Sequence, residues 1–279
     1  MRAGFIGAGK VGFTLGKYLA MHGIEISGYY SRTPASAKEA AEFTQSRYYT
    51  SIEEITKDSD TLFLTVPDGA IGEIWDDMRN LPIKNKNICH CSGSIPSTVF
   101  FDAENRGAYR YSIHPLYAIS SKATSYLDLG KACFTIEGSD AHLAELKALF
   151  SEMGNTVVAI SPDSKALYHA AAVMVSNQIV ALADISEAAA AEALSPLLLG
   201  NAQSVAEKGA VNALTGPIER GDAQTVSKHL QEIRKFAAES TVGQDILTAY
   251  TALSKQLIRI AQQKHPHKDY KHLEKELEQ

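Results

Sequence analysis

Apolar runs alternate with amphipathic stretches over roughly the first 160 residues of the chain. The runs have the spacing of strands, and the stretches between them carry apolar residues at helical spacing. The expected strands are 5–6, 24–30, 48–49, 60–68, 88–91, 109–116, 132–138 and 156–160, with expected helices at 14–22, 34–43, 52–55, 70–78 and 140–153. This alternation predicts the α/β fold class, with a mainly parallel sheet covered on both faces by helices.

The pattern changes after Pro162, where strand-like runs stop and Ala, Leu, Glu and Lys dominate. Expected helices span 166–183, 223–236 and 242–262, and Asp222 is a natural N-cap for the second of them. The sequence therefore predicts two domains, residues 1–161 and an all-α domain at 162–279. We expect the histidines of the charged tail, 265–279, to be solvated and not to form a metal site.

Three glycines follow the first strand at the spacing that binds dinucleotides, in the sequence Gly7-Ala8-Gly9-Lys10-Val11-Gly12. In such a turn the first glycine permits the bend, the second admits the pyrophosphate, and the third lets the helix pack on the strand. The N-terminus of the following helix, at Lys10 and Val11, favours the anion. An ordinary structural turn is the alternative interpretation, but the strand before and the helix after favour a Rossmann-type site.

The loop after the second strand should select the cofactor. An NAD site places an acidic residue here, whereas Ser31, Arg32 and Thr33 are suited to the 2′-phosphate of NADP(H). The alternative is that Arg32 is only a solvated cation. Val66, Pro67, Ser92 and Gly93 follow later strands, so we expect them along the bound cofactor by position alone; they are the remaining cofactor-binding candidates.

Candidate catalytic side chains come from both predicted domains. His114 follows a strand, and Lys165, His169 and Asn177 form an i, i+4 row on an otherwise apolar helix. Polar groups inside an apolar helix need partners. Lys165 could instead be a solvated lysine at a helix end, and His169 a hydrogen-bonded core histidine, neither of them with a function.

Charge and composition exclude several classes of protein. The net charge of −5 argues against a nucleic-acid partner. Cys89, Cys91 and Cys133 form no disulfide framework, and no second ligand pair completes a metal site with Cys89-His90-Cys91. Met1 leads directly into the first strand, without a signal peptide, and we expect a cytoplasmic protein without a membrane span.

The motifs resemble those of a bacterial reductase-like family. The N-terminal ones are GAGKVG, LTVPD at 64–68, HCSGS at 90–94 and SIHPL at 112–116. The C-terminal ones are Lys165 with YHAA at 168–171, SN at 176–177, LTGP at 214–217, RGD at 220–222 and His229, which resemble the family's helical domain of unknown function. The resemblance covers nearly the whole chain except the charged tail.

The family is similar to the group containing 6-phosphogluconate dehydrogenase, pyrroline-5-carboxylate reductase and ketopantoate reductase. The resemblance implies a Rossmann domain, NADP(H), a small carboxylate substrate and a homodimer formed through the helical domain. It also implies that Lys165 and Asn177 face the nicotinamide. In relatives these two residues lie one turn apart, whereas here His169 occupies that turn, so either Lys165 or His169 is the general acid.

Together these observations predict an NADPH-dependent reductase that transfers hydride to a carbonyl, with 2-dehydropantoate as the substrate. Asn177 and Ser92 would hold the substrate, and His114 would bind its carboxylate or close the site. Two alternatives stay open: an imine or deazaflavin-linked NADP reductase, and an NADPH-binding sensor without turnover.

Overall fold

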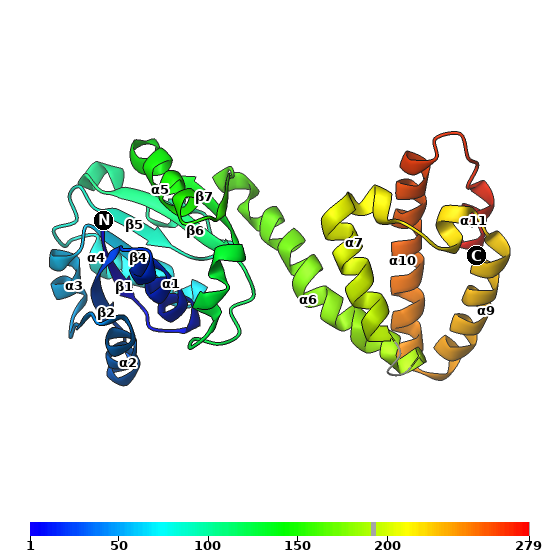
Figure 1. Ribbon diagram of the computed structural model, residues 1–279, viewed down its shortest axis with the longest axis horizontal. Helices are drawn as coiled ribbons and strands as arrows, with labels where there is room; N and C mark the ends of the chain where they lie inside the picture. The colour runs from blue at the N-terminus through cyan, green and yellow to red at the C-terminus, as the bar shows by residue number, and fades with distance from the viewer. Residues whose placement is uncertain (191–193, 279) are drawn as a thin grey trace. The chain divides into compact units, whose positions relative to one another are not determined.

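The computed structural model describes residues 1–190 and 194–278, and its contacts divide the chain into two compact units, Met1–Met174 and Val175–Gln279. The first unit contains an eight-stranded sheet (Figure 1). Its strands are β1 (Arg2–Ile6), β2 (Glu25–Tyr30), β3 (Arg47–Tyr48), β4 (Thr61–Leu64), β5 (Asn87–His90), β6 (Tyr109–Leu116), β7 (Cys133–Gly138) and β8 (Thr156–Ala159). They lie in the order β3-β2-β1-β4-β5-β6-β7-β8, and every adjacent pair is parallel except β6 and β7. The predicted mainly parallel sheet is thus confirmed.

Helices cover both faces of this sheet. They are α1 (Lys10–Met21), α2 (Pro34–Thr44), α3 (Ile52–Asp58), α4 (Asp68–Met78) and α5 (Asp140–Glu152). Neighbouring residues of a strand enter different cores: Phe5 packs with α1 and α2, while Ile6 packs with α3 and α4. Because strand side chains alternate between faces, this division explains why the central strands are apolar at consecutive positions.

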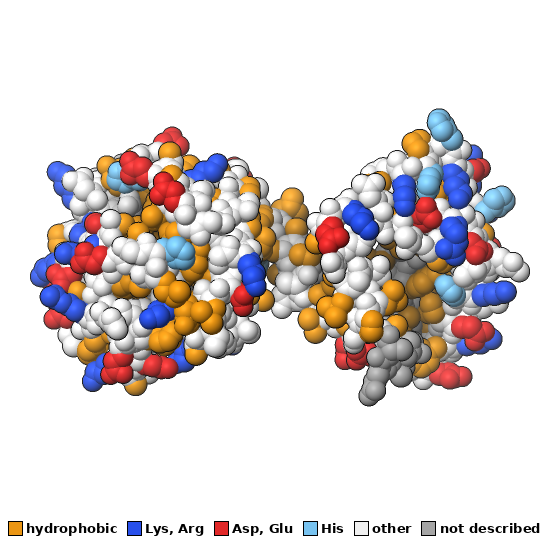
Figure 2. All heavy atoms as spheres, in the orientation of Figure 1, with side chains coloured by type: hydrophobic (Ala, Val, Ile, Leu, Met, Phe, Trp, Pro, Cys, Tyr) orange, Lys and Arg blue, Asp and Glu red, His pale blue; other side chains and the backbone are white. Residues whose placement is uncertain are grey.

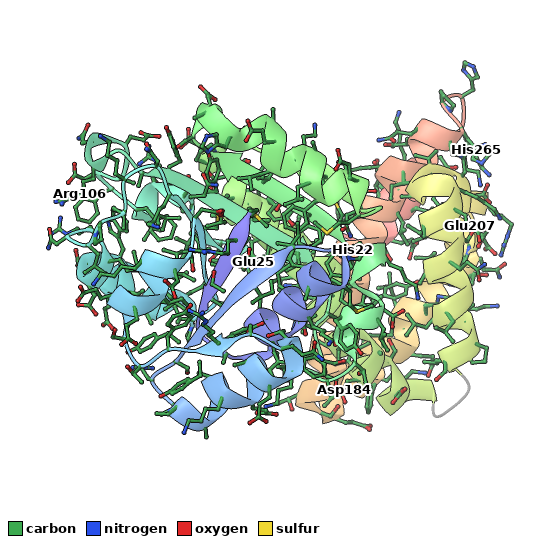
Figure 3. All side chains as sticks on the ribbon, turned by 60° about the vertical axis from the view of Figure 1, so that its left-hand side comes forward. His22, Glu25, Arg106, Asp184, Glu207 and His265 are labelled. Carbon is green, nitrogen blue, oxygen red and sulfur yellow. The ribbon has the colours of Figure 1, made fainter. Side chains whose placement is uncertain are left out.

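Arg106 shows how the loops of the first unit are anchored. Its guanidinium lies at the surface (Figure 3), where Nε is 2.8 Å from Oδ2 of Asp102 and Nη1 donates to the carbonyl of Arg79.

The loops of this unit also contain short helices. They are η1 (Ser97–Val99), η2 (Glu104–Arg106), η3 (Ser125–Leu127), η4 (Leu129–Lys131) and η5 (Pro162–Ser164).

The described part of the second unit is helical, as predicted. Its helices are the end of α6 (Lys165–Ala190), α7 (Ser195–Ala213), α8 (Pro217–Arg220), α9 (Ala223–Glu239), α10 (Thr241–Lys264) and α11 (Lys271–Glu276). Asp222 caps α9 by accepting from the Thr225 backbone N–H at 3.0 Å, which satisfies one of the unpaired donors of the first turn.

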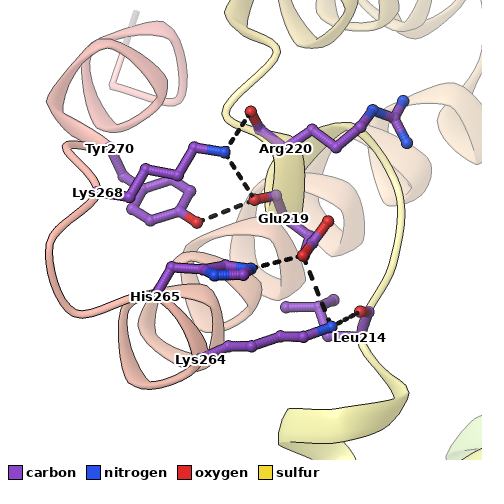
Figure 4. Close-up of polar contacts among 7 residues, drawn as sticks. All are labelled: Leu214, Glu219, Arg220, Lys264, His265, Lys268 and Tyr270. Atoms are coloured by element: carbon purple, nitrogen blue, oxygen red, sulfur yellow. Dashed lines mark hydrogen bonds and ion pairs between the residues drawn. The ribbon is translucent and has the colours of Figure 1, made fainter.

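The prediction that the tail histidines are solvated is confirmed for His267 and His272, which are exposed, but is wrong for His265, which is hydrogen-bonded. Tyr270, Leu273 and Leu277 are buried against α8, α9 and α10. Nε2 of His265 lies 2.6 Å from Oε1 of Glu219, and the Tyr270 hydroxyl donates to the Glu219 carbonyl at 2.9 Å (Figure 4). The hydrogen bond from His265 lowers the pKa of the Glu219 carboxyl. Because charged residues dominate the tail sequence, its three buried apolar residues could not be recognised before their contacts were known.

One helix meets the length and composition criteria for a membrane span. It covers Pro162–Glu187 and has a mean hydropathy of 1.4. Its first turn is nevertheless held by the sheet, because Lys165 is 1% exposed. The contacts divide the chain between Met174 and Val175, later than the sequence change after residue 161.

Candidate active site

The glycine-rich turn joins β1 to α1 and has the backbone that its sequence predicts. Gly7 has φ of +109°, and a Cβ there would lie 2.6 Å from the Thr65 carbonyl oxygen. A Cβ at Gly12 would lie 2.3 Å from Oγ1 of Thr65. Gly9 differs, since a Cβ there would meet nothing within 4 Å. Gly7 and Gly12 thus permit close packing, and Gly9 borders open space that a pyrophosphate can approach.

A cavity of about 320 Å³ opens beside this turn. Its lining includes predicted residues from three loops: Gly7, Gly9, Ser31, Arg32, Thr33, Val66 and Pro67. Lys10, Val11 and Gly12 form the start of α1 behind the turn. The residues present therefore fit a dinucleotide: backbone N–H groups at a helix N-terminus for the pyrophosphate, and a cation with hydroxyls for a 2′-phosphate.

Sequence reasoning missed two kinds of residue at this cavity. Thr65 fixes the turn, because its hydroxyl donates to the Gly7 carbonyl at 2.8 Å. Glu73 and Asp77 of α4 bring carboxylates to the same lining as Arg32. The i, i+4 spacing of these two acids on a helix following a strand was the available signal. A phosphate can bind here only if its attraction to the Arg32 guanidinium exceeds its repulsion by these two carboxylates.

A second cluster lies at the C-terminal ends of β5 and β6, where α6 begins. The Lys165 ammonium donates to the Ser92 carbonyl at 2.9 Å and to the Ser112 hydroxyl at 2.6 Å. These bonds use two of its three N–H donors. Burial lowers the pKa of Lys165, and the nearby Glu137 carboxylate raises it. The interpretation of Lys165 as a solvated helix end is therefore wrong.

Glu137 is the buried counter-charge that sequence reasoning missed. It is 2% exposed and stands directly opposite Ser112 in the antiparallel pairing of β6 and β7. Its two carboxylate oxygens accept from the Ser97 backbone N–H and hydroxyl, each at 2.6 Å. Since cross-strand neighbours lie side by side, the carboxylate lies near the Ser112 hydroxyl and acts on the ammonium through its charge.

Two predicted histidines flank the same place. A Cβ at Gly93 would lie 2.3 Å from Cδ2 of His169 and 3.0 Å from Nε2 of His114, so only a glycine lets both imidazoles approach the backbone. The two rings are 6.1 Å apart. Nδ1 of His114 is 3.1 Å from the hydroxyl of Tyr168, a partner that the sequence did not reveal.

Burial, together with the nearby Lys165 ammonium, lowers the pKa of His114 to about 4. His114 is therefore neutral near pH 7, and it can offer a carboxylate a hydrogen bond but no charge. The formal charge at this cluster comes from Lys165.

The hydroxyl of Ser92 is already fully used. It donates to Oδ2 of Asp68 at 2.8 Å and accepts from the backbone N–H groups of Ser94 and Ile95. Ser92 consequently acts on its surroundings through its carbonyl, which accepts from Lys165.

The structure does not bring all the candidates together. Lys165, His169 and His114 meet within the first unit, whereas Asn177 belongs to the second, where it is exposed and its Oδ1 accepts from the Ser176 hydroxyl. Among residues 1–190 and 194–278, no group of three or more His, Cys, Asp or Glu side chains is arranged to hold a metal ion.

Comparison with known proteins matches two successive parts of the chain to two families. Residues 1–115 match the Rossmann-like domain family, and residues 132–257 match a domain of unknown function, DUF2520. The two matches confirm the resemblance seen in the motifs, a Rossmann-like domain followed by this helical domain. No curated protein matches the chain.

Solved structures resemble the chain over nearly its full length. Protein TM1727 from Thermotoga maritima is 27% identical with a TM-score of 0.71, covering 94% of this chain and 99% of its own. BF3122 from Bacteroides fragilis, assigned as an NADP oxidoreductase, is 26% identical with a TM-score of 0.69, covering 92% and 98%. A reductive aminase from Aspergillus terreus, solved with NADPH and ethyl-5-oxohexanoate, shares the fold at 16% identity and a TM-score of 0.64, covering 98% of each chain.

The nearby charge of Glu137 predicts how Lys165 titrates. In Glu137→Gln the pKa of Lys165 falls, because burial still penalises the ammonium and the carboxylate no longer compensates. The free energy of unfolding falls by about 1–3 kcal/mol, since one Ser97 donor loses its acceptor. NMR titration of ¹³Cε-labelled lysine, with chemical denaturation, measures both quantities.

Glu152→Gln is the matched control, because Glu152 is an exposed glutamate of α5 in the same unit. It should leave both quantities unchanged. An unaltered Lys165 titration in Glu137→Gln would show that the carboxylate does not stabilise the ammonium.

Proposed function

We propose that this NADP-dependent oxidoreductase reduces 2-dehydropantoate to pantoate. The observation that carries the proposal is the buried Lys165 ammonium beside Gly93, at the strand ends where an open α/β sheet binds its ligands. A cation there suits a substrate that bears a carboxylate and gains negative charge on its carbonyl oxygen. The cradle at Gly7 and Gly9 and the hydroxyl-rich loop at Arg32 support NADPH as the reductant.

The chain's own residues would divide the work in the following way. Bound NADPH supplies a hydride to the carbonyl carbon of the substrate. The developing alkoxide oxygen takes a proton from Lys165 or His169, which lie on successive turns of α6. Neutral His114 hydrogen-bonds the substrate carboxylate, Asn177 holds the substrate, and Ser92 positions Lys165 through its carbonyl.

We also propose a cytoplasmic homodimer formed through the helical domain. Large apolar side chains are exposed along α6 and α7, among them Leu167, Val175, Val180, Leu197 and Leu199. Figure 2 shows hydrophobic side chains gathered along α6. Of the 26 residues of this helix, only Lys165, Asp184 and Glu187 are charged, and Asp184 is labelled in Figure 3. A helix apolar on nearly all sides is normally covered, and a second copy would cover it.

Turnover of 2-dehydropantoate tests the proposed reaction. Wild-type protein should oxidise NADPH with this keto acid and not with pyrroline-5-carboxylate or without substrate. Removal of the general acid should lower kcat by about 10²- to 10⁴-fold while the Kd for NADPH stays constant. Lys165→Met and His169→Asn, assayed separately by absorbance at about 340 nm, identify which residue it is.

If the protein prefers the cyclic imine pyrroline-5-carboxylate, its substrate is an imine and not the keto acid. Tight NADPH binding without turnover on any of these compounds would instead indicate a sensor.

Cofactor selection depends on Arg32. In Arg32→Ala the Kd for NADPH should rise about 10- to 100-fold, the value of a charge-assisted hydrogen bond, with little change for NADH. Calorimetric titration with both dinucleotides measures the difference. Arg47→Ala removes an exposed arginine outside this cavity and should change neither Kd. Equal losses for both cofactors would show that Arg32 does not contact the 2′-phosphate.

The dimer is tested by sedimentation. Wild-type protein should sediment at twice the chain mass of 30.2 kDa, and Val175→Glu or Val180→Glu should shift it to the monomer because a carboxylate would be buried unpaired. Thr248→Glu places the same charge at an exposed position of α10 and should leave the dimer intact. A monomeric wild type that binds lipid vesicles would show that a membrane covers α6.

A further inference from the structure

A second cavity lies wholly within the helical unit. It measures about 390 Å³, within the usual size range for small-molecule sites, and none of its walls comes from the first unit. Aliphatic side chains dominate the lining, including Leu182 and Ile185 of α6 and Leu257 of α10. The motif residues Thr215, Pro217 and His229 also line it, so the helical-domain motifs recognised in the sequence converge on this cavity.

Three of the polar side chains in this mainly apolar lining form a chain of hydrogen bonds. Nδ1 of His229 lies 2.9 Å from the hydroxyl of Tyr250. Tyr250 in turn is hydrogen-bonded to Ser254, which is 3% exposed, and this bond lowers the Tyr250 pKa, while the larger effect of burial raises it.

The direction of these bonds determines what the cavity can recognise. If the Tyr250 hydroxyl donates to Nδ1 of His229, the imidazole offers an N–H at Nε2. If the Tyr250–His229 bond runs the other way, the Tyr250 hydroxyl is left as a donor. In both cases the pair retains one proton for an acceptor, which suits a carbonyl or carboxylate oxygen.

We propose that this cavity binds an organic carbonyl or carboxylate compound with an aliphatic body. The aliphatic body would occupy the space between α6 and α10, and its oxygen would accept from the His229–Tyr250 pair. None of the residues that line this cavity is assigned a part in the reaction proposed above, and binding here needs no NADPH.

Calorimetric titration of the full chain with hexanoate, octanoate and octylamine tests the proposal. Octanoate should bind about tenfold more tightly than hexanoate, the effect of burying two more methylene groups. Octylamine should bind at least about tenfold more weakly than octanoate, because an ammonium offers no acceptor to the pair.

Variants test each wall of the site. Ala249→Trp fills the cavity and should abolish octanoate binding; Leu253→Trp does the same from a half-exposed position, in case the first variant fails to fold. Tyr250→Phe keeps the ring but breaks the hydrogen-bond chain, and it should weaken octanoate by about fivefold or more. His267→Ala removes an exposed histidine of the same unit outside the cavity and should bind as wild type does.

Three results would overturn the proposal: no octanoate binding, binding that both tryptophan variants preserve, or equal affinity for octanoate and octylamine. Sedimentation of the same variants identifies the competing occupant. If a tryptophan variant dissociates an oligomer and octanoate never binds, the cavity holds side chains of a second copy. NADPH oxidation is not a readout here, so failure of the proposed reductase activity leaves the result unaffected.

Discussion

The buried ammonium of Lys165 is the constraint on which the first unit depends most directly. A cation removed from water costs several kcal/mol unless it is paired and hydrogen-bonded. Its compensation comes from the carbonyl of Ser92, the hydroxyl of Ser112 and the carboxylate of Glu137, which stand at or next to three different strands. The ends of β5 and β7, the middle of β6 and the start of α6 must therefore form together, and the contacts that stabilise the fold also hold the charge that the proposed reaction would use.

The sheet order separates the two chemical tasks of this unit. The dinucleotide cradle lies where β1 and β4 end, and the charged cluster lies where β5 and β6 end, so neighbouring strands β4 and β5 join the two sites. Gly93 lies at this junction, and its missing side chain admits two imidazoles. The antiparallel strand β7 places Glu137 alongside β6. A parallel strand in the same position would pair with β6 in a different register.

Local patterns predicted the elements, because alternation, helical spacing and glycine turns act over a few residues, and the cradle at Gly7, Gly9 and Gly12 follows from such a pattern. What could not be predicted are contacts between distant segments. Glu137 meets Ser112 only through strand pairing, and Tyr168 meets His114 only because α6 begins over the sheet. His265 looked like a solvated charge for the same reason, since Glu219 becomes its partner only after α8 and α10 have packed.

Helix α6 takes part in both the proposed dimer and the proposed binding cavity. Its first turn is buried by the sheet through Lys165, while later residues such as Val175 and Val180 remain exposed, so the single chain leaves apolar surface uncovered. The same helix contributes Leu182 and Ile185 to the cavity of the helical unit. A partner that packs on α6 would change the walls of that cavity. By linkage, a compound that binds one state of assembly more tightly must favour that state by the same free energy. Ligand binding in the cavity and the number of subunits would then depend on each other.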